Sequence, residues 1–324
     1  MPILVNKPLV RALECMTISC PVIDDLLHIF LNGLGWEILC EGPLDSVMEE
    51  LWGVKGGSAG KRFCVVRSPG ANRGMVRLVS GPERQRTRNK AARWAGAEIL
   101  VSRDIDELYE RLKSFPKFCS MGEPANIDFS EFSSNVHRYF HGLVPGGTHL
   151  TLTMAVTQPD GREFPHSKNP VGHIFEVPLS SGQYTSTNHF YCETLGMETI
   201  LNSYFEEGPL HDMWDIPTGT PYNLDIHKGN SEGTGLGGIE VHGCAAGLID
   251  PEPASLAYFD GGACMVTYTS AAVEAAYKVV AENSAAMVLS APVEIMAPPY
   301  NGMRAFTFVG PSGERMEVCE AMWS

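Results

Sequence analysis

Short apolar runs alternate along the chain with segments of helical periodicity. The run LECMTISC at 13–20 is followed by a polar, helix-forming stretch at 24–28, and the run GHIFEVPLS at 172–180 by a similar stretch at 185–189. Both stretches lead into a Leu-Gly pair, and a glycine at that place is typical of a helix C-terminus. The pattern predicts strand, helix, stop and strand at both places.

A second kind of segment alternates with the first. Residues 97–112 read AEILVSRDIDELYERL, and residues 265–280 read MVTYTSAAVEAAYKVV. Each predicts a short apolar strand followed directly by an amphipathic helix, with Tyr109 and Tyr277 at matching positions. Neither helix ends in Leu-Gly, so the two kinds of segment are distinct. They alternate with a period of roughly 80 residues.

Each predicted helix is followed by β-rich sequence, such as RFCVVRSP and GMVRLVSG after the first and RAFTFVGPSGERMEVCE after the last. Each module is therefore one strand, one helix and about three strands, a βαβββ order. Four modules in pairs predict an α+β chain of two related halves, 1–168 and 169–324. The segment 165–172 has the Pro, Asn, Ser and Gly content of a linker between them.

Composition excludes several classes of function. The chain has 324 residues and is 44% hydrophobic and 19% charged, which are the proportions of a chain that buries a core. Its net charge of −14 argues against a nucleic-acid or anionic-membrane partner, because both need positive fields. No apolar stretch is long enough to cross a bilayer. A small molecule is the expected partner.

The cysteines indicate a reducing compartment. There are nine, spread evenly and odd in number, and no C-x-x-C pair occurs. A zinc knuckle and a thioredoxin-type pair are therefore not expected. The start, MPILVNKPLVR, lacks the continuous apolar region of a signal peptide. The cytoplasm is the expected location.

The segments VGHIFEVPLSS…NHFYCETLGME and GPSGERMEV, in the order of the modules, resemble the vicinal oxygen chelate superfamily. That group includes glyoxalase I, bleomycin-resistance proteins and extradiol dioxygenases. The resemblance covers nearly the whole chain, and it implies that modules pair into two incomplete, cupped β-barrels. It also implies a divalent metal ion inside a cup, held by the first and last strands of the paired modules.

The resemblance implies three metal ligands. The family's first-strand His falls on His173, and the last-strand Glu residues of the two module types fall on Glu240 and Glu317. One imidazole and two carboxylates suit Fe²⁺, Mn²⁺ or Zn²⁺, and the sequence does not choose among them. In the N-terminal half, Arg77 stands where Glu240 stands, and a guanidinium cannot bind a metal ion. The C-terminal half is therefore expected to be the active one.

Two histidines near Glu240 are candidates for proton transfer or substrate binding. His242 lies two residues after Glu240, so both side chains face the same way on a strand. There His242 could replace a ligand or shuttle a proton, and Glu240 itself is a candidate base. His227, on the preceding strand-like run, is a weaker candidate for contact with the substrate. The alternative for both histidines is an ordinary polar strand residue.

Two loops carry further candidates. The segment 298–304, PPYNGMR, offers Tyr300 to close over a substrate and Arg304 to meet an anionic group. The long segment 203–223 carries Trp214 among other aromatic residues and suggests a lid over a flat aromatic ligand. The alternatives are a plain turn for the first loop, and packing between the halves or across a homodimer for the second.

Carboxylate-rich ligation favours a metal-dependent lyase or isomerase of the glyoxalase-like type. Such an enzyme would polarise an oxygen of a small substrate, stabilise an enolate-like intermediate, and use a Glu or His for proton transfer. An extradiol dioxygenase of aromatic compounds is a second hypothesis. It is disfavoured because Thr307 stands at that class's Tyr position and no His lies between 243 and 324. A non-catalytic ligand-binding protein of the bleomycin-resistance kind is the third, and bound metal would separate it from an enzyme.

Overall fold

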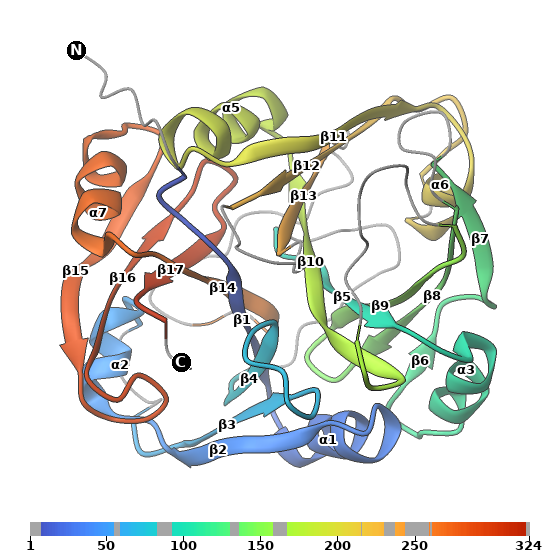
Figure 1. Ribbon diagram of the computed structural model, residues 1–324, viewed down its shortest axis with the longest axis horizontal. Coiled ribbons are helices and arrows are strands. Elements are labelled where there is room, and N and C mark those ends of the chain that lie inside the picture. The colour runs from blue at the N-terminus through green and yellow to red at the C-terminus, as the bar shows by residue number, and fades with distance from the viewer. Residues whose placement is uncertain are drawn as a thin grey trace.

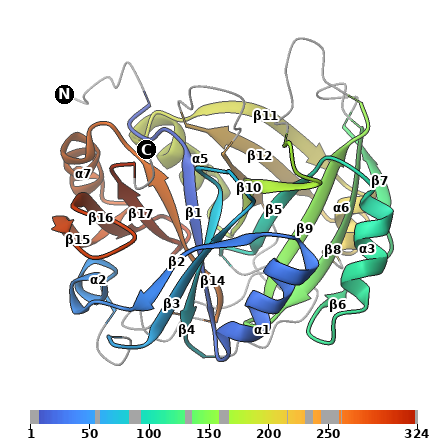
Figure 2. The ribbon, with the colours of Figure 1, turned by 60° about the horizontal axis from the view of Figure 1, so that its bottom comes forward.

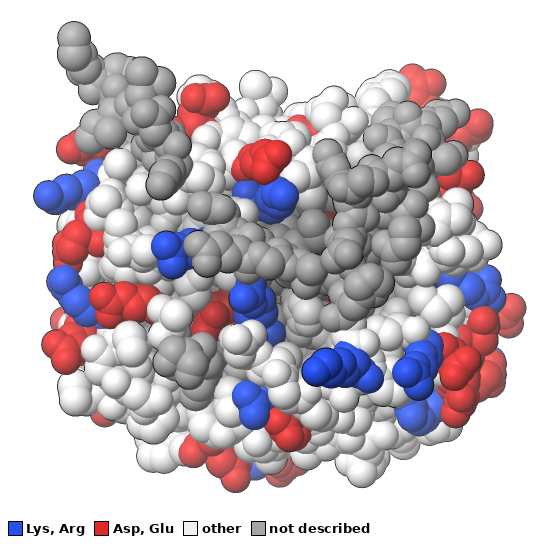
Figure 3. All heavy atoms as spheres, in the orientation of Figure 1, with Lys and Arg blue, Asp and Glu red and all other residues white. Residues whose placement is uncertain are grey.

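Two large mixed β-sheets make up most of the molecule, and the longer helices lie at its periphery (Figures 1 and 2). The computed structural model describes residues 8–54, 59–82, 93–129, 136–157, 167–214, 216–229, 237–243, 259 and 261–321. None of the helices in these ranges is long and apolar enough to span a membrane. Acidic and basic side chains are interspersed over the face drawn in Figure 3.

The strands and helices follow the four predicted modules, and the βαβββ order is confirmed. The first module contains β1 (Leu13–Cys20), α1 (Ile23–His28), the π-helical turn η1 (Ile29–Gly33), β2 (Glu37–Pro43), α2 (Ser46–Leu51), β3 (Arg62–Arg67) and β4 (Met75–Ser80). The second contains β5 (Gly96–Val101), α3 (Ile105–Lys113), β6 (Cys119–Ser120), β7 (Ala125–Asp128), β8 (Val136–Val144) and β9 (Thr148–Ala155). The third contains β10 (Val171–Ser181), α5 (Tyr184–His189), η2 (Phe190–Thr194), β11 (Glu198–Phe205), α6 (Pro209–Met213), β12 (Tyr222–Lys228) and β13 (Gly238–Gly243). The fourth contains β14 (Gly262–Thr269), α7 (Val273–Glu282), β15 (Met287–Ile295), β16 (Met303–Val309) and β17 (Arg315–Cys319).

The sheets join modules in the pairs one with four and two with three. The first sheet has the order β15-β16-β17-β14-β1-β4-β3-β2. The second has the order β11-β12-β13-β10-β5-β9-β8-β6, with β7 paired to β8. Antiparallel pairs join the modules, β1 with β14 in the first sheet and β10 with β5 in the second. We call the concave sides of these sheets the first cup and the second cup.

The expected halves 1–168 and 169–324 do not correspond to the two sheets. Strands from 13–80 and 262–319 form the first sheet, and strands from 96–243 form the second. Similarity between modules reveals which share a local fold. It does not reveal which first strands meet, because that choice depends on contacts between distant parts of the chain.

The Leu-Gly pairs end their helices as predicted. Each helix continues into a π-helical turn, and Gly35 and Gly196 follow with φ of 72° and 70°. Glycine adopts this backbone conformation without the clash that a Cβ would cause. The first and third modules therefore share the same turn, which sets the direction of β2 and β11.

One hydrophobic cluster takes side chains from all four modules. Leu26 of α1, Leu108 of α3, Tyr191 of η2 and Ala276 of α7 all belong to it. Because burial of apolar surface is the main favourable term in folding, this cluster holds the two sheets in one molecule.

Candidate metal centre

Three glutamates meet inside the second cup. Glu98 on β5, Glu176 on β10 and Glu240 on β13 each offer a carboxylate oxygen, and these oxygens lie within 4.8 Å of one another. Strand register explains the meeting, because Glu98 pairs with Glu176 and β13 runs beside β10 with Glu240 opposite Pro178. Among the described residues this is the only group of three or more potential metal ligands at such a spacing.

The group is electrostatically costly without a cation. Glu176 is 5% exposed and Glu240 is 7% exposed. Burial raises the pKa of Glu98 well above its usual range, and the charge of Glu240 adds to the rise. Burial and then the charges of Glu240 and Glu98 raise the pKa of Glu176 in the same way. No Lys or Arg in the described ranges forms an ion pair with any of the three. The donor set therefore fits a hard divalent cation, which carboxylate oxygens prefer and whose charge would offset the repulsion.

A histidine and a tyrosine continue from Glu240. His242 Nε2 lies 3.2 Å from Glu240 Oε2, and His242 Nδ1 forms a hydrogen bond with the hydroxyl of Tyr222 on β12. A proton on Nε2 would be donated to Glu240, which leaves Nδ1 to accept from Tyr222. Tyr222, His242 and Glu240 can together carry a proton to or from the cluster of three glutamates, called the carboxylate group below.

Trp214, directly after α6, lies across the second cup. Its ring centroid is 5.0 Å from that of His149 on β9, 6.2 Å from that of His141 on β8, and 5.8 Å from that of His242 on β13. The strands β5 and β10, which carry two of the glutamates, lie between β9 and β13 in the sheet. The ring therefore extends across β5 and β10, the strands that lie between these histidines.

Two ring nitrogens in this part of the cup have no hydrogen-bond partner among the described residues. They are Nε2 of His141 and Nε1 of Trp214, and both side chains are 5% exposed. His141 is held at its other nitrogen, where Nδ1 lies 2.9 Å from Thr151 Oγ1. Burial lowers the pKa of His141 to about 3, so the ring is neutral near pH 7. An unpaired buried polar atom costs about 1–3 kcal/mol, and both nitrogens therefore suit a polar ligand in the cup.

The first cup has a different polar centre. Arg77 Nη2 on β4 lies 3.3 Å from Glu317 Oε1 on β17, and neither side chain is exposed. Three further donors reach the Glu317 carboxylate, Trp52 Nε1 at 2.7 Å, the Tyr300 hydroxyl at 2.6 Å and the Thr267 hydroxyl at 2.9 Å. Glu317 is thus fully partnered within the chain.

Register relates the two centres. Arg77 lies opposite Thr17 on β1, and Glu240 lies opposite Pro178 on β10, with β4 and β13 as the parallel neighbours of β1 and β10. Arg77 therefore stands at the place of Glu240, as the sequence predicted. The first cup carries a cation of its own at a position where the second carries a carboxylate.

Comparison with known proteins shows the fold. No family model matches the chain, and no curated protein matches it. Glyoxalase I from Zea mays is similar in structure over 96% of this chain and 92% of its own, with a TM-score of 0.62 and 16% identity. A putative dioxygenase from Bacillus subtilis subsp. subtilis str. 168 is similar over 97% of this chain and 86% of its own, with a TM-score of 0.62 and 12% identity. The chain has the vicinal oxygen chelate fold.

Within the vicinal oxygen chelate fold, the three predicted ligands do not form one site. Glu240 lies in the second cup and Glu317 in the first, because the third and fourth modules belong to different sheets. His173 lies beside Gly74, in the loop between β3 and β4 of the first sheet. Burial, with a smaller effect of Arg73, lowers the pKa of His173 to about 4. Only Glu240 of the expected set belongs to the carboxylate group.

The remaining predicted residues lie in three places. His242 and Trp214 are in the second cup. Tyr300 is fully buried in the first cup, and Arg304 on β16 is half-exposed in an ion pair with Glu274 of α7. His227 on β12 faces away from the second cup and contacts α5 and η2.

Sequence reasoning missed Glu98 and Glu176. Each is a single carboxylate inside an apolar strand, in AEILV and in HIFEVPL. A carboxylate in such a run is costly unless it has a partner, and this is the signal that could have found both. His141 was missed too, because an isolated histidine in a strand points to no particular chemistry.

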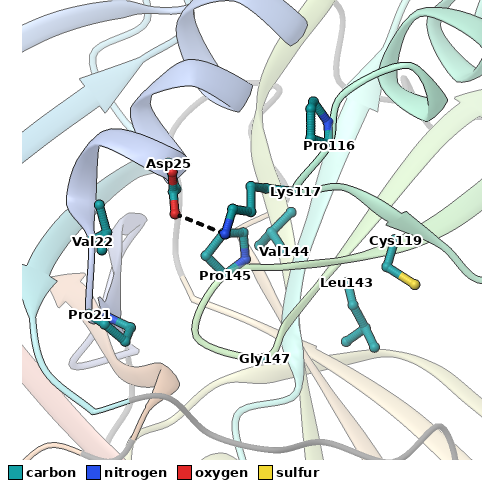
Figure 4. Close-up of a pocket in the computed structure, with 10 residues that line it drawn as sticks. All are labelled: Pro21, Val22, Asp25, Pro116, Lys117, Cys119, Leu143, Val144, Pro145 and Gly147. Carbon is teal, nitrogen blue, oxygen red and sulfur yellow. Dashed lines mark ion pairs between the residues drawn. The ribbon is translucent and has the colours of Figure 1, made fainter.

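A separate pocket lies away from the carboxylate group (Figure 4). Its volume is about 560 Å³, and its walls are the start of α1, the turn after α3 and the β8–β9 hairpin. Lys117 points across it toward Asp25, and the two charged groups are 3.6 Å apart. None of the three glutamates lines this pocket, so it does not belong to the candidate metal centre.

Proposed function

We propose that the chain is a metal-dependent lyase or isomerase of the glyoxalase-like type, acting on a small oxygenated substrate in the second cup. One observation carries the proposal. Glu98, Glu176 and Glu240 bring three carboxylates together without a counter-cation among the described residues. In the first cup the chain supplies positive charge through Arg77, whereas the second cup needs it from a bound ion.

Glu98, Glu176 and Glu240 would hold the ion. Carboxylate oxygens favour a hard cation, so Mn²⁺ suits the set better than Fe²⁺ or Zn²⁺. When bound, such an ion polarises a substrate oxygen. The Thr153 hydroxyl, 3.4 Å from Glu98 Oε2, donates to that carboxylate and helps to orient it.

Proton transfer is assigned to Glu240 and His242. His242 is fixed between Tyr222 and Glu240 by hydrogen bonds at both ring nitrogens, so it needs no reorientation to accept or donate a proton. A base and its relay in fixed positions are what proton movement at a substrate carbon requires.

The cup favours an uncharged substrate with a flat face. Trp214 offers an aromatic surface, and Trp214 Nε1 and His141 Nε2 each offer one free hydrogen-bonding position. The buried cations of the described chain, Arg77 and Arg315, both belong to the first sheet. An anionic substrate would therefore meet carboxylates without a compensating side chain.

A ring-cleaving dioxygenase is the weaker alternative. Non-haem iron oxygenases typically use two histidines and one carboxylate, whereas the group described here holds three carboxylates and no imidazole. Oxygen uptake with a catechol as substrate would reverse this preference.

Metal analysis tests the proposal. Elemental analysis of the purified protein should find about one divalent ion per chain, and Glu240→Gln and Glu98→Gln should lose it. Glu314→Gln is the matched control, because Glu314 is a fully buried glutamate outside the group of three, and this variant should keep the ion. A metal-free wild type that takes up no added Mn²⁺ would overturn the proposal. If that protein still binds an aromatic ligand, a binding protein is the better description.

A further inference from the structure

A cysteine, a histidine and an asparagine form a connected group outside both cups. Cys192 Sγ in η2 lies 3.4 Å from His227 Nδ1 on β12. His227 Nε2 lies 2.8 Å from Asn188 Oδ1 on α5. The Thr199 hydroxyl shares the Nδ1 side of the ring at 3.0 Å. None of these residues contributes to the candidate metal centre.

Hydrogen bonds fix the tautomer of His227. Asn188 Nδ2 donates to Asp225 Oδ2 at 2.6 Å, so the Asn188 amide presents Oδ1 to the histidine. Asn202 donates to the other oxygen of Asp225 at 2.5 Å, which holds that carboxylate in place. Oδ1 can only accept, so Nε2 of His227 must carry the proton. The lone pair on Nδ1 then faces both the Thr199 hydroxyl at 3.0 Å and the Cys192 sulfur at 3.4 Å. Cys192 Sγ also lies 3.3 Å from Thr199 Oγ1, so the thiol proton can reach Nδ1 directly or through that hydroxyl, as base catalysis on a thiol requires.

The fold does not need this polar group. The first module has the same helix, π-helical turn and strand pair, and its Ile38–Val66 pair stands at the register of Thr199–His227. Burying hydrogen-bonded polar side chains in place of apolar ones is at best neutral for stability. The four corresponding positions of the first module are all apolar: Leu27, Leu31, Ile38 and Val66.

We propose that Cys192 is a nucleophilic modification site, with His227 as its general base and Asn188 as the residue that positions the base. The reactants it would take are small, uncharged alkenes conjugated to a carbonyl. The sulfur bonds to the β-carbon, the S–H bond breaks, and His227 Nδ1 takes the proton. The proton then returns to the α-carbon, so the thioether contains every atom of both reactants and no oxidant or reductant is needed.

Burial determines how the pair works. It raises the pKa of the Cys192 thiol and lowers the pKa of His227 to about 4, so the two rest as neutral thiol and neutral imidazole near pH 7. The charged groups that act on the pair are both acidic, Asp225 and Glu193. Proton transfer to His227 therefore accompanies attack by sulfur, and no ion pair forms beforehand.

Cys119 provides an internal comparison. It is exposed on β6, and its sulfur approaches a backbone carbonyl, Ser120 O, rather than an imidazole. Cys192 is half-buried, so access alone would make Cys119 the faster thiol. The proposal instead predicts that Cys192 reacts faster than Cys119.

Labelling with N-ethylmaleimide, followed by peptide mass spectrometry at each cysteine, tests the proposal. Cys192 should react first, and His227→Gln, which can keep the hydrogen bond to Asn188, should slow it at least about tenfold. The exposed neighbour His189→Gln is the matched control and should leave the rate unchanged. Faster labelling of Cys119, or an unchanged Cys192 rate in a natively folded His227→Gln protein, would overturn the proposal.

A pH profile of the wild type gives a second test that needs no variant. The base is free well above pH 4, so labelling of Cys192 should change little between pH 6 and 8. A thiol that depends on its own ionisation gains about tenfold per pH unit below its pKa. A tenfold gain per unit at Cys192 would show that His227 is not its base.

Discussion

The guanidinium of Arg77 lies 3.3 Å from the carboxylate of Glu317 in the first cup, with both side chains fully buried. By register, Arg77 holds the place that Glu240 holds in the second cup. One cup thus has a cation built into the chain, and the other brings three carboxylates together. The two sites therefore differ in the charge of their side chains, although they share a fold.

Glu317→Gln should destabilise the protein strongly. It leaves the charge of Arg77 buried without its partner, and we expect a loss of about 3–5 kcal/mol in the free energy of unfolding. Urea denaturation followed by circular dichroism measures the loss. The double variant R77M/E317Q removes both charges and should be more stable than E317Q. A double variant that is no more stable than E317Q would show that the unpaired charge of Arg77 does not cause the loss of stability in E317Q.

Glu176→Gln should have the opposite effect in the absence of metal. It removes one of three repelling carboxylates, so the metal-free protein should gain about 1–2 kcal/mol. Added Mn²⁺ should raise the Tm of the wild type but not that of the variant, because only the wild type keeps the full ligand set. Thermal melts with EDTA and with Mn²⁺ separate the two effects. A variant whose Tm still rises with Mn²⁺ would exclude Glu176 as a ligand.

Local features of the fold could be predicted from the sequence. The apolar run at 13–20 and the Leu-Gly pairs at 34–35 and 195–196 depend on neighbouring residues, and all appear where expected. The pairing of β1 with β14 could not be predicted, because it joins the two ends of the chain. That pairing separates Glu317 from Glu240, so the predicted ligand set depended on a contact that sequence similarity between modules does not encode.

The candidate site could be predicted only in part. Glu240 was expected from the family resemblance, and His242 was found because its spacing from Glu240 places both on one face of a strand. On β10 the expected ligand was His173, whereas the carboxylate that enters the cup is Glu176, three residues further along an eleven-residue strand with two register shifts. Such irregularities change which side chains face inward, and they leave no mark in the hydrophobic pattern.

Trp214→Phe should weaken ligand binding without removing metal. Phenylalanine keeps an aromatic face but lacks Nε1–H, so an oxygenated ligand should bind about tenfold more weakly. Catechol, which is uncharged near pH 7, is a suitable probe, and its carboxylate derivative protocatechuate should bind less well to the wild type. Calorimetric titration of the metal-loaded proteins measures both. Trp36→Phe, a buried tryptophan of the first module, is the control and should bind as the wild type does.

The outcomes of the Trp214 experiment separate the substrate from the metal. If Trp214→Phe keeps its metal and binds catechol as well as the wild type does, the indole does not contact the ligand and the proposed metal centre stands. If protocatechuate binds more tightly than catechol, the preference for an uncharged substrate is wrong.

The buried carboxyl of Glu314 should make stability depend on pH near neutrality. Burial raises its pKa to about 7, although hydrogen bonds from the Tyr191 hydroxyl at 2.7 Å and the Ser312 amide at 2.8 Å favour the ionised form. An unfolded glutamate has a pKa of about 4.3. Between these values the folded protein holds a proton that the unfolded chain has released, so stability falls as pH rises. The contribution of this one group is roughly 4 kcal/mol across the range.

Glu314→Gln isolates that contribution, because glutamine does not titrate. The unfolding free energy of the variant minus that of the wild type should increase steadily between about pH 4.5 and 7 and then level off. Urea denaturation at several pH values measures the difference, and other titrating groups cancel between the two proteins. Glu107→Gln, at an exposed position on α3, is the matched control substitution. A constant difference for Glu314→Gln would mean that Glu314 is already ionised throughout this range, and the raised pKa would then be wrong.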